Sequence, residues 1–156
     1  MDKIRAGLKG IRSELKPNNL KLAAEAIMTT DKYPKYFSCQ VGSAIIAGIA
    51  KGAGMIEPNM ATMLAYLMTD AELPAASLRP MLKRVVDRTF NAMSIDTDTS
   101  TSDTVVLMAN GLAGSVNPRE FEAGLLKVSE YLTCELARSG EGATETDYSG
   151  CDWRPE

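Results

Sequence analysis

Apolar residues recur at every third or fourth position in several parts of the chain, the spacing that places them on one face of an α-helix. The spacing predicts four helices, over residues 2–15, 20–28, 78–90 and 121–136. Pro17 and Asn18-Asn19 separate the first two helices. Asn117-Pro118 marks the start of the last one, because proline suits the first position of a helix.

Shorter apolar segments have the pattern of β-strands. Residues 36–50 predict two short strands with Gly42-Ser43 as the turn between them. Residues 62–69 are apolar at both alternating sets of positions, which is typical of a strand buried on both faces. Residues 105–109 predict a further strand. Because helices are interspersed with these strands, the predicted fold class is α+β.

Two segments lack any apolar period. Residues 51–59 contain glycine and proline, and residues 96–103 are rich in Thr, Ser and Asp, so both are predicted to be loops. No linker or internal repeat divides the chain, and 156 residues suit a single domain. Residues 145–156 have no regular pattern and are expected to form a loose tail.

The overall charge narrows the class of partner. With a net charge of −3, the chain lacks the basic excess of a surface that binds nucleic acid or anionic membranes, so neither partner is expected. The longest uncharged apolar stretch, residues 41–50, is too short to span a bilayer. No signal peptide is visible, and Cys39, Cys134 and Cys151 are expected to be free thiols. The predicted location is therefore the cytoplasm.

The chain contains no histidine, which limits the chemistry available to it. A Ser-His-Asp triad, a Cys-His pair and a zinc site of the H-E-x-x-H type are excluded within these residues. No metal site is expected. The glycines after Lys51 lack the Walker spacing, and residues 96–107 lack the Gly and Glu of a calcium loop. A nucleophile would need a lysine, a carboxylate or a free α-amine as its base.

Residues 51–64 have a pattern that suits self-cleavage. A glycine-rich loop leads to a small residue, Ala61, which is followed by Thr62 at the start of a predicted strand. The Thr62 hydroxyl would attack the Ala61 carbonyl, and hydrolysis would free the Thr62 amine to serve as base for its own hydroxyl. The alternative from the residues alone is an ordinary threonine at the beginning of a strand.

Five segments, in the same order, resemble the ornithine acetyltransferase family, also called bifunctional glutamate N-acetyltransferase/amino-acid acetyltransferase. The resemblance covers residues 1–144. The matching segments are the self-cleavage segment, a substrate-threonine segment, a Thr/Asp-rich loop, an Ala-Asn-Gly that follows it, and an acidic substrate motif: residues 51–64, 26–31, 90–104, 109–111 and 140–144.

The resemblance implies transfer of an acetyl group from N-acetylornithine to glutamate in arginine biosynthesis, without a cofactor; acetyl-CoA is a possible second donor. It implies cleavage between Ala61 and Thr62, with Thr62 as nucleophile and acetyl carrier. Thr30 and Lys51 would contact the substrate, and Glu141 would hold its amino end. Without the resemblance, Lys51 would be a solvated loop lysine and Glu141 an exposed carboxylate at a helix end.

The resemblance also implies an architecture. The family has a layered sheet-and-helix sandwich of the ornithine acetyltransferase/DmpA-like type, reminiscent of N-terminal-nucleophile hydrolases, and this chain would hold an incomplete, central part of it. Cleavage would give an α piece, residues 1–61, and a β piece beginning at Thr62, with the family region ending at residue 144 and a divergent tail at 145–156. Two α and two β pieces would assemble as a heterotetramer.

Family members are longer at both ends and carry an upstream Thr-Gly pair that stabilises the oxyanion. Three alternatives therefore stand beside the arginine-pathway enzyme: a truncated inactive module, an acetyltransferase of secondary metabolism, and an aminopeptidase of the same architecture. Intact mass would separate the inert module from a self-cleaving chain, because only the latter gives two pieces.

Overall fold

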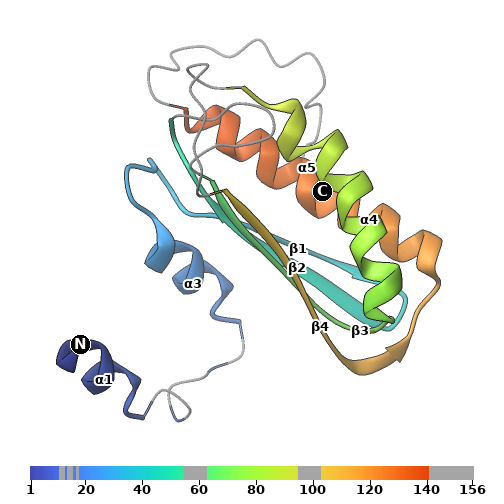
Figure 1. Ribbon diagram of the computed structural model, residues 1–156, viewed down its shortest axis with the longest axis horizontal. Helices are drawn as coiled ribbons and strands as arrows, with labels where there is room; N and C mark the ends of the chain where they lie inside the picture. Colours follow the sequence, from blue (N-terminus) through green and yellow to red (C-terminus); the bar gives the residue numbers. More distant parts are fainter. Residues whose placement is uncertain (11–12, 14–15, 17, 55–62, 95–102, 141–156) are drawn as a thin grey trace.

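The computed structural model describes residues 1–10, 13, 16, 18–54, 63–94 and 103–140 (Figure 1). Four strands form one sheet in the order β1-β2-β3-β4. The strands are β1 (Lys35–Val41), β2 (Ala44–Lys51), β3 (Leu64–Glu72) and β4 (Thr104–Ser115). The helices are α1 (Asp2–Leu8), α3 (Leu20–Ile27), α4 (Ala75–Arg88) and α5 (Pro118–Arg138), with a short 3₁₀ helix, η1 (Phe90–Ala92).

The sheet combines two kinds of pairing. β1 with β2, and β2 with β3, are antiparallel, whereas β3 and β4 are parallel. The parallel pair needs a crossover, which α4 provides between the two strands. The prediction of an α+β fold is therefore confirmed.

Helices α4 and α5 lie together over one face of the sheet (Figure 1), and α3 contacts β1 and β2 from the other side. A Cβ at Gly124 would overlap Val41 Cγ2, so the glycine lets α5 approach the sheet closely. Asn117 caps α5 by accepting a hydrogen bond of 2.9 Å from the Arg119 amide, as its position before Pro118 predicts. The core beneath α5 contains Ile46, Leu67, Phe121, Leu125, Val128, Leu132 and Leu136.

The other face of the sheet is only partly covered. Along β3, buried residues alternate with half-buried ones, so the expectation of a strand buried on both faces is wrong. Helices α4 and α5 cover only one face, which is the physical reason. Tyr36, Ile45 and Met108 are exposed on strands of this sheet.

Three further expectations need correction. The expected first helix is interrupted, because α1 ends at Leu8, and residues 11–12 and 14–15 of the expected range lie outside the described residues. β4 continues to Ser115, beyond the expected end at residue 109. Cys39 is a free thiol, but Cys134 is disulfide-bonded, so the expectation of free thiols is wrong for Cys134.

Candidate active site

Asp31 connects three segments that are far apart in the sequence. Its Oδ1 accepts a hydrogen bond of 2.6 Å from Lys35 Nζ at the start of β1 and one of 2.7 Å from the Gly52 amide just after β2. Its Oδ2 accepts a hydrogen bond of 3.2 Å from the Thr29 amide. One carboxylate therefore ties the loop before β1 to the beginning of β1 and to the end of β2.

The Asp31–Lys35 ion pair is completely enclosed, because both side chains are 0% exposed. Lys35 Nζ also donates a hydrogen bond of 3.4 Å to the Tyr33 carbonyl and lies 5.3 Å from the centroid of the Tyr33 ring. A buried charge is tolerated when it is paired and hydrogen-bonded, and Lys35 satisfies this condition.

Lys51 is the last residue of β2, and not part of a loop as expected. The residue is 9% exposed, so the solvated loop lysine of the alternative interpretation is also excluded. The chain turns away from the sheet at Gly52, whose φ of 149° is readily adopted only by glycine. This turn directs the Gly52 amide to Asp31 and fixes the backbone beside Lys51.

Thr30 lies in the loop between α3 and β1 and is exposed. Its two neighbours, Thr29 and Asp31, are joined by the hydrogen bond described above. The buried carboxylate of Asp31 therefore holds the backbone on either side of the exposed Thr30.

The beginning of β3 is fixed on both sides of Met63. The Met63 amide donates a hydrogen bond of 2.7 Å to Asp103 Oδ1, and the Met63 carbonyl accepts one of 3.1 Å from the Thr104 amide. The Ala61–Thr62 cleavage site, whose Thr62 immediately precedes Met63 in the sequence, lies outside the described residues.

The C-terminal end of α5 meets the loop that carries Thr30. The Lys32 amide donates to Ser139 Oγ, and Lys32 Nζ donates to the Gly140 carbonyl, each over 3.4 Å. The Tyr33 hydroxyl donates to the Glu135 carbonyl over the same distance. Glu141, the next residue after Gly140, lies outside the described residues.

The strand register places these contacts at one end of the sheet. Lys35 pairs with Ala50, Lys51 with Leu64, and Leu64 with Thr104. The beginning of β1, the end of β2 and the beginnings of β3 and β4 are therefore neighbours. The structure brings Thr30 and Lys51 to this end, together with the described residues that adjoin Thr62 and Glu141.

At this end of the sheet, the pKa values of Asp31 and Asp103 are shifted in opposite directions. Burial acts to raise the pKa of Asp31, but hydrogen bonds from Lys35 and two backbone amides outweigh burial, so this pKa lies below its ordinary value. Burial raises the pKa of Asp103 above its ordinary value, although the Met63 amide and the positive charge of Lys51 oppose the shift.

The lowered pKa of Asp31 should make the fold sensitive to acid. Because the unfolded chain binds this proton first as the pH falls, the contribution of Asp31 is present above the unfolded pKa of about 3.9 and is lost as the pH falls through the folded pKa. We expect Asp31→Asn to flatten the acid side of the curve of unfolding free energy against pH, measured by urea unfolding.

Asp103→Asn is the matched comparison. The folded state binds the Asp103 proton first as the pH falls, so ionised Asp103 opposes stability at neutral pH. Its removal should therefore steepen the rise of stability with pH. If unfolding free energy depends on pH in the same way in Asp31→Asn as in the unaltered protein, the lowered pKa of Asp31 is contradicted.

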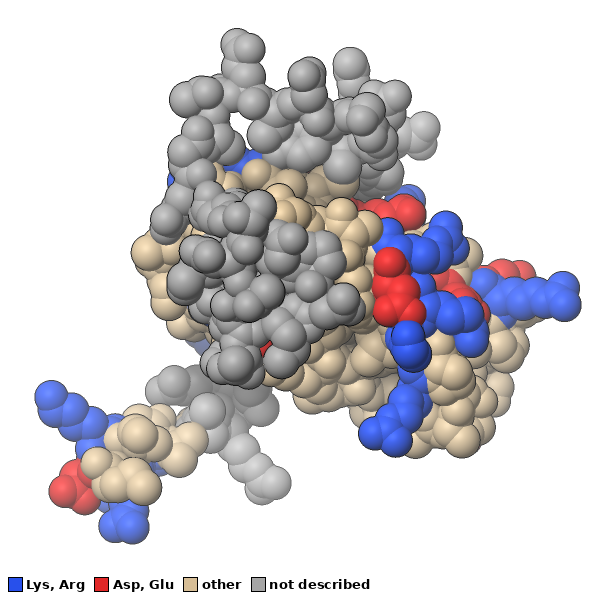
Figure 2. Space-filling model, turned by 45° about the horizontal axis from the view of Figure 1, so that its top comes forward, with Lys and Arg blue, Asp and Glu red and all other residues tan. Residues whose placement is uncertain are grey.

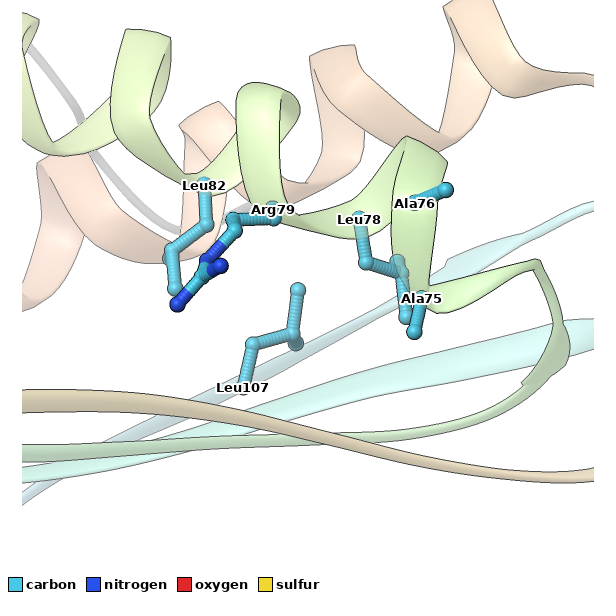
Figure 3. A pocket seen from close by; sticks show the side chains of 6 residues that line it. All are labelled: Ala75, Ala76, Leu78, Arg79, Leu82 and Leu107. Carbon is cyan, nitrogen blue, oxygen red and sulfur yellow. The ribbon is translucent and has the colours of Figure 1, made fainter.

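A separate hollow lies between α4 and β4 (Figure 3). Its volume is about 440 Å³, and its lining is apolar except for Arg79. None of the residues predicted to act on substrate lines it: the lining residues are Ala75, Ala76, Leu78, Arg79, Leu82 and Leu107. The candidate active site is therefore the end of the sheet and not this hollow.

Charge is mixed over the surface that Figure 2 shows, where basic and acidic side chains lie next to one another. Arg84 of α4 forms a two-pronged ion pair with Glu122 of α5, with both distances 2.7 Å. Within the described ranges, no helix is long and apolar enough to cross a membrane. The same residues contain no group of three acidic or cysteine side chains able to hold a metal ion.

Sequence reasoning gave no role to Asp31, Lys35 or Asp103. Asp31 stood inside a matched segment, but its partners Gly52 and Lys35 are revealed only by folding. Asp103 stood at the end of a segment that was predicted only to be a polar loop. In each case the sequence signal was a single polar residue without a distinctive spacing.

Comparison with known proteins decides the family. The ArgJ family model matches residues 1–147. The chain belongs to the ArgJ family. It is 53% identical to the arginine biosynthesis bifunctional protein ArgJ 2 of Nostoc sp. over 145 residues, which are 93% of this chain and 38% of that relative.

Two further ArgJ relatives agree. The ArgJ 2 protein of Clostridium acetobutylicum is 49% identical over 97% of this chain and 40% of its own length. The glutamate N-acetyltransferase Oat2 of Streptomyces clavuligerus is 51% identical over 93% of this chain and 37% of its own length. The chain thus spans about two fifths of the length of these curated relatives.

Proposed function

We propose that this ArgJ-family chain contributes to an enzyme that transfers an acetyl group from N-acetylornithine to glutamate in arginine biosynthesis. The proposal is supported by one observation. Thr30 and Lys51 lie at the same end of the sheet as the described residues next to Thr62 and Glu141. Relatives at about half identity are named for arginine biosynthesis and for glutamate N-acetyltransferase activity.

Self-cleavage would prepare the nucleophile. Thr62 Oγ attacks the Ala61 carbonyl carbon, the C–N bond breaks, and the Ala61 acyl group is left as an ester on Thr62. Water hydrolyses this ester, giving a carboxyl group on Ala61 and a free hydroxyl and amine on Thr62. The two hydrogen bonds that hold Met63 support this step, because a fixed backbone limits the motion of its neighbour.

Acetyl transfer would then follow in two displacements. The Thr62 amine takes the proton from its own hydroxyl, and the oxygen attacks the acetyl carbonyl of N-acetylornithine. The C–N bond to ornithine breaks, the amine of ornithine leaves with the proton, and the acetyl group stays on Thr62 as an ester. The amino group of glutamate attacks this ester, forms N-acetylglutamate and regenerates the hydroxyl.

The proposed substrate contacts follow from charge. Lys51 is nearly buried at the end of β2, and its side chain has no hydrogen bond or ion pair to another described residue. Its ammonium group suits a substrate carboxylate, because a point charge is effective where water is largely excluded. Thr30 would donate or accept a hydrogen bond, and Glu141 would bind the substrate's amino group.

The chain would form part of a layered sandwich of sheets and helices, and cleavage would yield pieces that assemble as two α and two β subunits. The reaction would take place in the cytoplasm without a metal or bound cofactor, and acetyl-CoA would be an alternative acetyl donor.

The test is capture of the acetyl-enzyme. Incubation of the purified chain with N-acetylornithine should add the mass of one acetyl group to the piece that begins at Thr62, and glutamate should remove it. An acetyl group found only on residues 1–61 would contradict the proposal.

A further inference from the structure

The buried Asp31–Lys35 pair lies next to both proposed substrate-binding residues, yet it has no part in the chemical steps above. Both side chains are fully enclosed, and their charged atoms are 2.6 Å apart. A buried ion pair seldom stabilises a fold more than an apolar pair of similar volume would, because desolvation offsets the attraction. The location of the pair therefore suggests a role beyond stability.

Each carboxylate oxygen of Asp31 holds the backbone beside one proposed contact residue. Oδ2 accepts from the amide of Thr29, which directly precedes Thr30. Oδ1 accepts from the amide of Gly52, which directly follows Lys51. The same rigid group thus sets the spacing between Thr30 and Lys51. Its hydrogen bond to Gly52 joins residues that are 21 positions apart in the sequence.

Lys35 balances the charge of Asp31 and leaves Lys51 for another anion. The Lys35 ammonium is engaged by the Asp31 carboxylate, the Tyr33 carbonyl and the Tyr33 ring. Lys51 has no ion pair to any residue that the structure describes, although the positive charge of Lys51 acts on Asp103. The neutralised Asp31 can therefore organise the site without competing for Lys51.

We propose that Asp31, balanced by Lys35, is a positioning residue that holds Thr30 and Lys51 at the spacing required to bind the carboxylate end of the substrate. This role rests on the proposed function, because Thr30 and Lys51 are its substrate contacts. Asp31 itself touches no substrate and acts through the backbone on either side.

Calorimetric titration of the full chain with N-acetylornithine, and separately with glutamate, tests the role. The variant Asp31→Leu/Lys35→Met removes both charges and the hydrogen-bond acceptor while keeping apolar volume. We expect it to remain folded with a lower unfolding midpoint, because the Gly52 and Thr29 amides lose their acceptor, and to bind about tenfold more weakly, because small displacements of positioning groups are costly. Asp31→Asn/Lys35→Met keeps an acceptor for the Gly52 amide and should recover most of the affinity.

A matched control is available on α4. Lys83 and Asp87 have the same i,i+4 spacing and the same 2.6 Å separation, but both side chains are largely exposed. Asp87→Leu/Lys83→Met should leave binding unchanged.

If Asp31→Leu/Lys35→Met does not fold, Asp31→Ser/Lys35→Met replaces it, since the serine hydroxyl is too short to hold both amides.

The outcomes separate the two proposals. Folded variants without the Asp31 acceptor that bind as tightly as the unaltered chain would overturn the positioning role and leave the proposed function intact. The Asp31→Leu/Lys35→Met changes should weaken binding less when Lys51 is already methionine, because residues that act together are not additive. An equal loss of affinity with and without Lys51 would overturn an action through Lys51. An unaltered chain that binds neither ligand would overturn the proposed function and the positioning role with it.

Discussion

Replacing Thr62 with alanine is expected to leave the chain as one piece and to abolish acetyl transfer. The hydroxyl oxygen of Thr62 is the attacking atom in both proposed reactions, so its removal leaves no nucleophile for either. Intact mass after long incubation is the measurement. The unaltered chain should give two masses that correspond to residues 1–61 and 62–156, whereas the variant should give only the full mass.

Thr62→Ser is the matched control, because it keeps the hydroxyl and loses only a methyl group. It should still cleave and accept an acetyl group, although at a different rate. Cleavage between residues 61 and 62 in the alanine variant would show that another group breaks the bond. A chain that stays whole in all three forms would favour the inert module.

Replacing Lys35 alone with methionine is expected to lower the free energy of unfolding by about 3–5 kcal/mol. The cause is the Asp31 carboxylate, which would remain buried without its positive partner. The loss is large compared with a typical total stability of about 5–15 kcal/mol. Urea unfolding followed by circular dichroism measures it.

The double variant Asp31→Leu/Lys35→Met is the informative comparison, because it removes both charges. Its stability should recover most of the loss, and the remaining deficit reflects the buried Gly52 amide, which loses its acceptor. Lys83→Met breaks an exposed pair of the same spacing and N–O distance and should have little effect. A Lys35→Met variant as stable as the Lys83→Met variant would contradict the burial of the pair.

The sequence signals that succeeded are local ones. Asn117-Pro118 predicted the start of α5 because capping involves only adjacent backbone groups. Gly42-Ser43 predicted the β1–β2 turn for the same reason. β4 extends beyond the predicted end at residue 109, through Gly111 and Gly114, which both have positive φ, and through a shift of its register with β3.

The geometry of the site depends on contacts that local patterns do not reveal. Lys51 was expected in a loop because glycines follow it, yet pairing with Leu64 keeps it in the sheet. The Asp103 contact with Met63 joins residues 40 positions apart. Thr30 and Lys51 were found through family resemblance, whereas the carboxylate that holds them becomes visible only in three dimensions.

The antiparallel pairing of β2 with β3 has a consequence for a cleaved molecule. The two strands are neighbours in the middle of the sheet, and the Ala61–Thr62 bond lies between them in the sequence. Cleavage would place β1 and β2 on one polypeptide and β3 and β4 on another, joined through a continuous ladder of hydrogen bonds. Folding would then become an association of two chains, and stability would acquire a dependence on protein concentration that a single chain does not have.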